Sequence, residues 1–321
     1  MPRFTPRRAL GKTGFVATRL GIGDVADRAL PIEQCVATVR RAMDAGLNVI
    51  DTAPNYEDGY SEQIVGSALR ESRQRDRMFL VTKIDHHDDP IAPQVQGSLS
   101  RLGLDHVDLF VFHGLSSVEG WHRVTQPGSG FDQLSEQRRA GNLCYRGISS
   151  HHPDVLKLAI ESGLCDVVLF AIGAFVDERY VNEILPLAKR NNVGTICFKT
   201  FGAGKLLANT TGYNRPLVDR PRGKISSGGS SEIDSGGDAI ATLPRLTANQ
   251  CVRYTLTADP DVALLGMSFP NEQDAAFAAA QSFVPMSADE MIATRAAAAQ
   301  AIRHKGPCWW NPDPRNPSEL S

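Results

Sequence analysis

Four polar residues stand at or just after the ends of three consecutive apolar segments. The segments are 48–53, 78–84 and 106–113, and the polar residues are Asp51, Tyr56, Lys83 and His113. Burying a charged group without a partner costs several kcal/mol, so such a pattern requires groups that satisfy one another. If the three segments are neighbouring parallel strands, the four side chains meet at one edge of the sheet.

These residue types can perform acid–base chemistry together. A tyrosine has a pKa of about 10 in water, and an adjacent lysine ammonium lowers it by stabilising the tyrosinate. A carboxylate paired with the lysine keeps the ammonium charged and oriented. Tyr56 can then donate a proton to a developing alkoxide, while His113 hydrogen-bonds the same oxygen or orients the substrate. The set holds no strong nucleophile and no metal cluster, so it suits carbonyl reduction with a hydride from a cofactor.

Each of the four residues also has an ordinary structural interpretation. Asp51 can cap a turn, Tyr56 can be a loop aromatic, and Lys83 can extend its ammonium to solvent. A single histidine such as His113 is more often a hydrogen-bonded core residue. The combination at matching positions of successive strands favours the catalytic interpretation, because the strand C-termini of a barrel carry catalytic groups.

Strand and helix patterns alternate along the chain. The residues 8–23 read as a β-rich start with a turn at Gly11–Gly14, which suggests a hairpin lid. Further strands are predicted to end at Asp51, Lys83 and His113 and to span 143–148, 166–172, 193–198 and 262–265. Helices are predicted over 31–45, 61–72, 93–102, 131–140, 153–162, 180–190, 248–256 and 272–281, with an extra C-terminal helix at 287–304.

The pattern predicts an α/β fold, a (β/α)8 TIM barrel with an N-terminal β-hairpin, as one domain over 1–321. The strands are continuously apolar, as expected when both faces of a parallel sheet are covered. A doubly wound sheet is the alternative, but no G-x-G-x-x-G follows a strand. Two segments depart from the alternation: a flexible Gly- and Ser-rich insertion at 208–243 and an irregular, proline-rich tail at 306–321, whose Trp309 and Trp310 are expected to pack on the body.

Composition narrows the classes of protein. The chain has 321 residues, 42% hydrophobic content and a formal charge of −2, which argues against a nucleic-acid-binding surface. The six cysteines include no C-x-x-C pair and are expected to be reduced thiols, with no metal site. The sequence contains no apolar run of about 20 residues, and its first residues include no apolar stretch of signal-peptide length. We therefore expect a cytoplasmic protein without a membrane span. The oligomeric state is left open.

Several stretches resemble the aldo-keto reductase family over about residues 8–280. They are 46–69, Val81–Lys83, 105–113, 141–151 and, more weakly, 198–205. The resemblance implies a (β/α)8 barrel that reduces aldehydes and ketones with NADP(H), less often NAD(H), bound in extended form. It also implies that Tyr56 is the proton donor, that Lys83 and Asp51 tune it, and that His113 orients the carbonyl of a small-molecule substrate.

The resemblance also implies a set of cofactor contacts. Ser149 matches a family serine that holds the carboxamide, whereas Ser150 and Leu169 stand where Asn and Gln are common. The Ser-Ser-His version resembles a bacterial subgroup. The stretch 266–277 has no basic residue to bind a 2′-phosphate, and Lys199 or Lys205 can compensate for this lack. The expected cofactor residues are Gly23, Asp51, Ser149, Ser150, Lys199, Thr200, Gly202, Gly204, Gly266, Ser268 and Gln273.

Other functions stay open at this point. A nicotinamide-binding regulatory or sensor protein with little turnover is the main alternative. An isomerase or aldolase would need a Schiff-base lysine, and Lys83 beside Asp51 would stay protonated. Cys308 by itself cannot ligate an iron–sulfur cluster. The substrate is not determined: the loops 114–130 and 208–243 and the tail offer Trp121, His122, Trp309 and Trp310, either as an aromatic pocket or as packing.

Overall fold

The computed structural model describes residues 4, 6–28, 30–207, 245–267, 270–303, 308 and 310–311. The insertion predicted at 208–243 lies outside the described residues, and so does most of the tail at 306–321. Within the described ranges the predicted alternation of strands and helices can be followed directly.

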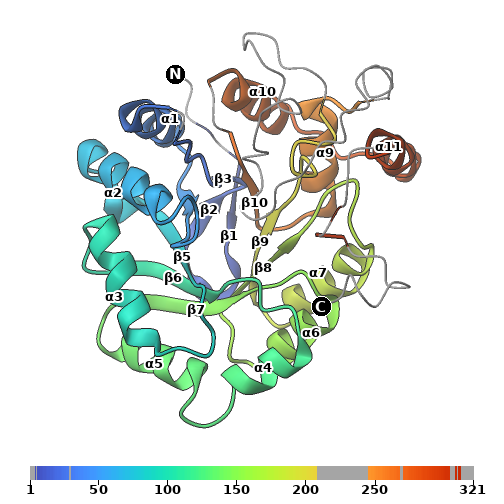
Figure 1. The fold of residues 1–321 in the computed structure, drawn as a ribbon. Coiled ribbons are helices and arrows are strands. Elements are labelled where there is room, and N and C mark those ends of the chain that lie inside the picture. The colour runs from blue at the N-terminus through green and yellow to red at the C-terminus, as the bar shows by residue number, and fades with distance from the viewer. Residues whose placement is uncertain are drawn as a thin grey trace.

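Eight parallel strands close into a barrel, which confirms the predicted fold class (Figure 1). Each strand pairs with its neighbours in chain order, and β10 closes the ring by pairing with both β9 and β3. The strands are β3 (Leu20–Ile22), β4 (Val49–Asp51), β5 (Phe79–Ile84), β6 (Val107–Phe112), β7 (Leu143–Ser149), β8 (Val167–Ala171), β9 (Gly194–Phe198) and β10 (Val262–Leu265).

Helices surround the barrel, and the extra C-terminal helix α11 lies outside this ring beside α9 (Figure 1). Most of them match a predicted segment, but α4 falls inside the stretch expected to be a loop. Its seven residues are too few for a periodic pattern, although Ser117 caps it by accepting a hydrogen bond from Gly120 N. The helices are α1 (Ile32–Asp44), α2 (Tyr60–Ser72), α3 (Ile91–Leu102), α4 (Val118–Val124), α5 (Gly130–Arg139), α6 (Pro153–Glu161), α7 (Leu185–Arg190), α9 (Ala248–Ala258), α10 (Pro270–Gln281) and α11 (Ala288–Ala301).

Two apolar cores explain why the strands read as continuously apolar. Successive side chains of a strand point to opposite faces, so one set fills the barrel and the other meets the helices. The inner core is lined by residues such as Val49, Val81, Val111, Val167 and Val262. The outer core takes the intervening residues of the same strands together with the inner faces of the helices.

The N-terminal hairpin closes the end of the barrel where the strands begin. It consists of β1 (Arg7–Ala9) and β2 (Val16–Thr18), joined through the single 3-10 turn Gly11–Thr13. Leu10 is fully buried in the inner core. The Tyr145 hydroxyl on β7 donates to Thr13 O at 2.6 Å. The predicted hairpin lid therefore seals this end, and the strand C-termini face the open end.

The hairpin turn supplies a test of this closure. Gly11 and Gly14 both have left-handed φ angles, 47° and 74°, but a Cβ on Gly11 would lie 2.2 Å from Gly194 N whereas Gly14 has no atom within 4 Å. We expect Gly14→Ala to cost about 1 to 2 kcal/mol for its φ angle. Gly11→Ala should cost about 1 to 3 kcal/mol more because the hairpin must move off β9. Urea unfolding of both variants measures the difference in the free energy of unfolding. An equal loss in the two variants would show that the hairpin turn does not pack against β9 at Gly194.

Candidate active site

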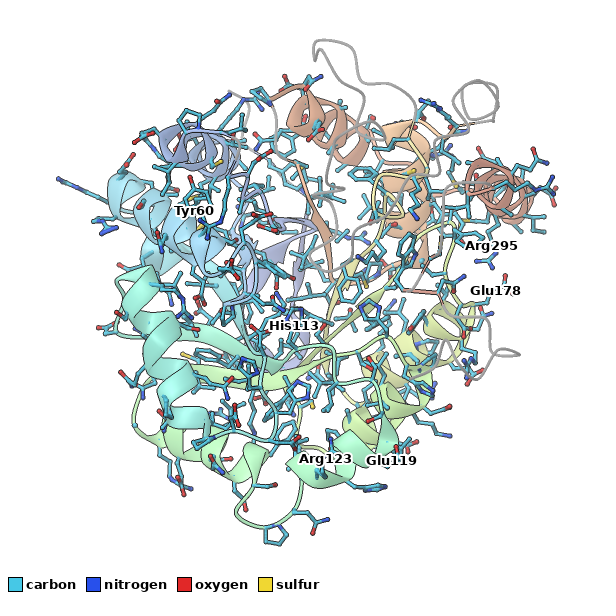
Figure 2. The ribbon with its side chains drawn as sticks, viewed as in Figure 1. Tyr60, His113, Glu119, Arg123, Glu178 and Arg295 are labelled. Atoms are coloured by element: carbon cyan, nitrogen blue, oxygen red, sulfur yellow. The ribbon has the colours of Figure 1, made fainter. Side chains whose placement is uncertain are left out.

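The alternation of side chains brings the predicted residues to one end of the barrel. Asp51 and Lys83 each follow an inner-core valine by two residues, so they share its inward face. The register pairs Asp51 with Val81 on β5 and Lys83 with Val111 on β6, which makes the two side chains neighbours. His113 follows β6 directly and lies near the middle of the barrel in Figure 2.

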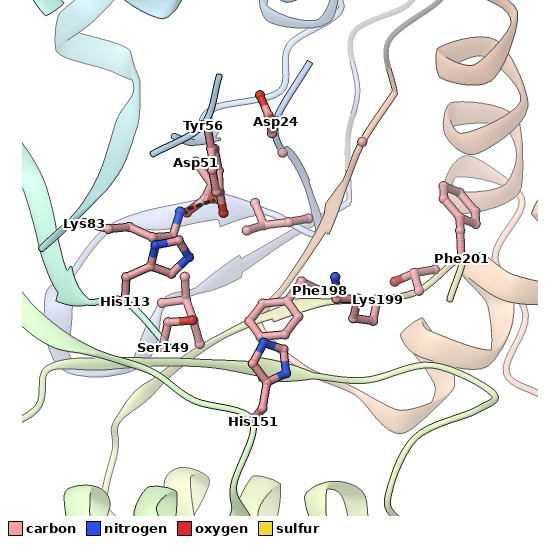
Figure 3. A pocket seen from close by; sticks show the side chains of 15 residues that line it. Asp24, Asp51, Tyr56, Lys83, His113, Ser149, His151, Phe198, Lys199 and Phe201 are labelled. Atoms are coloured by element: carbon pink, nitrogen blue, oxygen red, sulfur yellow. Dashed lines mark hydrogen bonds and ion pairs between the residues drawn. The ribbon is translucent and has the colours of Figure 1, made fainter. Parts of the chain in front are cut away.

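Lys83 and Asp51 form a buried ion pair (Figure 3). Lys83 Nζ lies 2.8 Å from both carboxylate oxygens of Asp51 and donates to Thr52 O at 2.8 Å. The two side chains are only 2% and 6% exposed. Burial alone would lower the pKa of Lys83, but the Asp51 carboxylate and Tyr56 outweigh it and hold that pKa well above its usual value. The ammonium therefore stays charged.

Tyr56 lies over this ammonium. Its ring centroid is 4.4 Å from Lys83 Nζ and 5.6 Å from the ring centroid of His113, with the two rings nearly perpendicular. The next two residues, Glu57 and Asp58, adopt left-handed φ angles of 49° and 52° ahead of Gly59, so the chain turns sharply from Tyr56 into α2. The structure thus brings all four residues of the predicted acid–base set into one pocket.

A carboxylate that sequence reasoning did not single out holds the histidine. His113 Nδ1 lies 2.5 Å from Asp85 Oδ1, and Asp85 Oδ2 accepts a hydrogen bond from Asn55 N at 2.9 Å. Burial lowers the pKa of His113, and Asp85 offsets only part of that effect. Burial would raise the pKa of Asp85, but the hydrogen bonds from His113 and Asn55 N together with the charges of His113 and Lys83 outweigh it and lower that pKa. At neutral pH the pair is a neutral imidazole and a carboxylate.

Asp24 and His151 also line the pocket and were not predicted. Asp24 follows β3, and burial raises its pKa to about 6 although it accepts a hydrogen bond from Ala26 N at 3.0 Å. Burial lowers the pKa of His151 to about 3, and its ring centroid lies 5.1 Å from that of Phe198. A signal for Asp24 was present, since it is a carboxylate near the end of an apolar segment as Asp51 is, but the bounds of that first strand were not predicted.

Six of the predicted cofactor residues line the pocket. Lys199 is notable among them because burial lowers its pKa to about 7. Its Nζ lies 5.5 Å from the Trp310 ring centroid, and Lys205 Nζ lies 5.4 Å from the same ring. Trp310 is buried, as expected for the tail. The six residues are Gly23, Asp51, Ser149, Lys199, Thr200 and Gly266.

The other predicted cofactor residues lie elsewhere or are not described. Ser150 is fully buried and accepts a hydrogen bond from His152 N at 3.1 Å. Gly202 and Gly204 form the turn after β9 with φ angles of 54° and 82°. Ser268 lies outside the described residues. Gln273 is buried, and its side-chain amide donates to Thr38 O at 2.8 Å.

Arg41 brings a positive charge to the region where the sequence after β10 has none. Its guanidinium reaches from α1 to the first turn of α10, where it donates to Pro270 O at 3.2 Å, Gln273 Oε1 at 3.0 Å and Asp274 Oδ1 at 2.6 Å. Gln273 therefore serves to place Arg41. Sequence reasoning missed this residue because it lies more than 200 positions away from its partners.

The predicted aromatic loop residues have other places. Trp121 on α4 is buried against Phe131, with ring centroids 5.5 Å apart, so it belongs to the outer core. His122 is exposed on the same helix. Trp309 lies outside the described residues. Figure 2 likewise places Glu119 and Arg123 of α4 at the rim of the molecule, away from His113.

The residues of the pocket fit a nicotinamide cofactor. Leu169, Phe198 and Leu264 supply apolar surface for a flat ring, with the Ser149 hydroxyl beside it. Burial lowers the pKa of the Lys199 amino group, and an anionic phosphate bound beside it would raise that pKa again. Apolar surface and a lysine at the strand C-termini match the flat ring and the phosphates of a dinucleotide.

This barrel and its acid–base pocket define a nicotinamide-dependent oxidoreductase. Residues 19–298 match the model of the aldo/keto reductase family, and the chain belongs to that family. The match confirms the resemblance seen in the sequence, and with it NAD(P)H-dependent reduction of carbonyl compounds.

Individual relatives are distant but extend over much of the chain. The aldo-keto reductase YhdN of Bacillus subtilis is 27% identical, over 83% of this chain and 86% of its own. The NADH-specific methylglyoxal reductase of Escherichia coli is 26% identical, over 63% and 69%. A structure of an aldo-keto reductase from Klebsiella pneumoniae in complex with NADPH superposes with a TM-score of 0.64 at 21% identity, covering 94% and 96% of the two chains.

Two sequence expectations about the chain as a whole can be compared with the structure. All six cysteines are free thiols, as expected, and Cys144 is the exposed one. Among the described residues, the helices are too short or too polar to cross a lipid bilayer.

Asp24 should make stability depend on pH. Its pKa is about 6 in the folded state against 3.8 ordinarily, so between these values the folded protein holds a proton that the unfolded chain has lost. Stability therefore falls as the pH rises through this window, by about 1 to 3 kcal/mol for this group. We expect Asp24→Asn to remove that fall, so that the stability of the variant relative to the wild type increases as the pH rises from about 4 to 6.

Urea unfolding of wild type and Asp24→Asn at several pH values between about 4 and 7 measures this difference. Asp89→Asn, at an exposed carboxylate after β5, is the matched control and should track the wild type. A constant difference between wild type and Asp24→Asn across the window would contradict the raised pKa.

Proposed function

We propose that Tyr56 protonates the oxygen of an aldehyde or ketone. The Lys83 ammonium, paired with Asp51, stabilises the tyrosinate that remains. The observation that carries this proposal is the Lys83 ammonium, fixed at 2.8 Å by both oxygens of Asp51 and lying 4.4 Å from the centre of the Tyr56 ring. A fixed positive charge stabilises the tyrosinate left after proton transfer. Because the ion pair is buried, water screens this effect little.

The cofactor chemistry is supplied from outside the chain. A reduced nicotinamide dinucleotide provides the hydride that the side chains cannot. On this chain we assign its ring end to Ser149 and the apolar surface of Leu169, Phe198 and Leu264, and its phosphates to Lys199 and Thr200. His113 faces the same pocket and orients the substrate oxygen next to Tyr56.

Replacing the proposed proton donor tests the assignment. We expect Tyr56→Phe to lower kcat/KM for carbonyl reduction by about 10²- to 10⁴-fold, the usual contribution of a general acid. Steady-state assays on a panel of aldehydes and ketones measure this, and tryptophan fluorescence checks that the variant still binds the dinucleotide.

Tyr60→Phe is the matched control. Tyr60 is four residues away at the start of α2, where its ring lies 5.0 Å from the Arg28 guanidinium carbon, outside the pocket. It should keep wild-type activity. Reduction at the wild-type rate by Tyr56→Phe would exclude Tyr56 as the donor.

For the dinucleotide, the proposal is NADP(H) rather than NAD(H). The family resemblance places the 2′-phosphate near the residues after the last barrel strand, and Arg41 reaches the first turn of α10 there. Arginine is the usual partner of a phosphate. The Klebsiella protein binds NADPH, whereas the Escherichia coli relative is specific for NADH, so the choice varies among relatives and depends on such local groups.

Arg41→Gln tests this choice. The variant should lose about tenfold or more in NADPH affinity, which corresponds to about 1.5 kcal/mol for a charged hydrogen bond, and should bind NADH as the wild type does. Titration of tryptophan fluorescence with each dinucleotide measures both constants. Arg40→Gln is the control, because Arg40 is the adjacent residue of α1 and pairs with the exposed Glu71 instead. An equal loss for NADPH and NADH would remove Arg41 from phosphate recognition.

A regulatory or sensor role is the second candidate. The altered carboxamide positions Ser150 and Leu169 favour it, as does the lack of a basic residue in 266–277, although Arg41 reaches that region from α1. A sensor has no evident need for the full set of Asp51, Tyr56, Lys83 and His113. Tight dinucleotide binding without turnover on the carbonyl panel would favour it.

The reduced thiols agree with the proposed cytoplasmic location.

A further inference from the structure

The hydrogen bond between His113 and Asp85 determines which ring nitrogen carries the proton. Asp85 is a carboxylate at neutral pH, because burial, which raises its pKa, is outweighed by the sum of the hydrogen bonds from His113 and Asn55 N and the charges of His113 and Lys83, which lower it. A carboxylate can only accept hydrogen bonds. The proton in the 2.5 Å contact between Asp85 Oδ1 and His113 Nδ1 therefore belongs to the histidine.

This assignment leaves Nε2 for a molecule in the pocket. A neutral imidazole has one N–H and one lone pair, so a proton on Nδ1 makes Nε2 an acceptor. A carbonyl oxygen offers only lone pairs and gains nothing from an acceptor. A hydroxyl offers a proton and can bind there. Nε2 donates to a carbonyl oxygen only after the ring has taken up a second proton.

We propose that Asp85 is a positioning residue that keeps a proton on Nδ1 of His113, so that the neutral ring binds the alcohol form of the substrate and only the doubly protonated ring binds the carbonyl form. The inference rests on the proposed function, since it concerns the substrate of the same pocket. Through His113, Asp85 thus determines whether the site binds the alcohol or the carbonyl form of the substrate. Tyr56 remains the proposed proton donor.

The groups around His113 bear on which ring nitrogen the Asp85 carboxylate keeps protonated. Burial and the Lys83 ammonium lower the pKa of His113, while Asp85 and Asp51 raise it. His87 binds the backbone carbonyl of His113, with its Nε2 2.8 Å from that oxygen, so it does not compete for the ring. Asp85 contacts the ring nitrogen Nδ1 at 2.5 Å. The charged and titratable groups in the described part of the chain that face His113 are Asp51, Tyr56, Lys83, Asp85, His87 and His151.

Asp85→Asn separates positioning from mere packing. Asn55 N donates to the second oxygen of residue 85 at 2.9 Å and needs an acceptor there. The carboxamide oxygen of the variant must turn to Asn55, which aims its NH₂ group at His113 Nδ1. Because an NH₂ group donates, Nδ1 must become the acceptor and the ring proton must move to Nε2.

The first measurement is nitrogen-15 NMR of histidine-labelled protein without cofactor or substrate, from about pH 5 to 9. His113→Asn identifies the signal. We expect the wild type to show the proton on Nδ1 and Asp85→Asn to show it on Nε2. The exposed carboxylate of Asp88, on the same loop and paired with Arg123, gives the control Asp88→Asn, which should match the wild type.

The second measurement is the pH profile of kcat/KM for carbonyl reduction. In the wild type it should fall about tenfold per pH unit above the pKa of His113, because the doubly protonated ring is lost. In Asp85→Asn the neutral ring already carries a proton on Nε2, so this fall should disappear. Asp85→Glu, which restores a carboxylate, should restore the fall.

A wild-type spectrum with the proton on Nε2 at neutral pH would overturn the proposal, even if the variant failed to fold. Unchanged tautomer and pH profile in a folded Asp85→Asn would overturn it as well. These outcomes are independent of Tyr56→Phe, because the tautomer is read without turnover. Failure of the proposed proton donor and failure of this inference are therefore distinguishable.

Discussion

The buried contact between the Lys83 ammonium and the Asp51 carboxylate is the constraint on which the site depends. Both groups are almost inaccessible to water, and removing either partner would leave an uncompensated charge in the barrel. The carboxylate keeps the lysine charged, and the charged lysine in turn acts on the Tyr56 ring above it. A buried ion pair contributes little to net stability when compared with an apolar pair of the same shape. The proposed role of Tyr56 as the proton donor gives a reason for its presence here.

The barrel positions this pair through alternation. Inner-core valines occupy the strand positions two residues before Asp51 and Lys83, so the polar groups form the next layer above an apolar floor. The hairpin seals the opposite end with Leu10 and its turn. Water can therefore approach the acid–base set from the strand C-termini but not from below. The geometry limits solvent access and lets weakly hydrated groups act on one another at low effective dielectric.

The charges of the pocket are arranged by burial. Burial lowers the pKa of both His113 and His151 and keeps them neutral, while it raises the pKa of Asp24 to about 6. Lys199 on the other side has a pKa lowered to about 7 by burial. At pH 7 about half of the Lys199 side chains carry a proton, and an anionic phosphate beside Lys199 would favour the ammonium form. The same desolvation thus leaves neutral imidazoles in the pocket and a lysine that an anionic phosphate can protonate.

The sequence alone predicted the fold class and singled out Asp51, Tyr56, Lys83 and His113, which the fold brings into one pocket, because strand ends are readable where an apolar run stops at a polar residue. It could not determine contacts between residues far apart in the chain. Arg41 meets Gln273 only because α1 and α10 lie side by side in the closed barrel, and Asp85 meets His113 only because β5 and β6 are neighbours. Nor could it show that Gln273 is buried with internal partners. Local patterns encode periodicity and strand ends, whereas hydrogen-bond partners, burial and the pKa shifts that follow from them are properties of the packed tertiary structure.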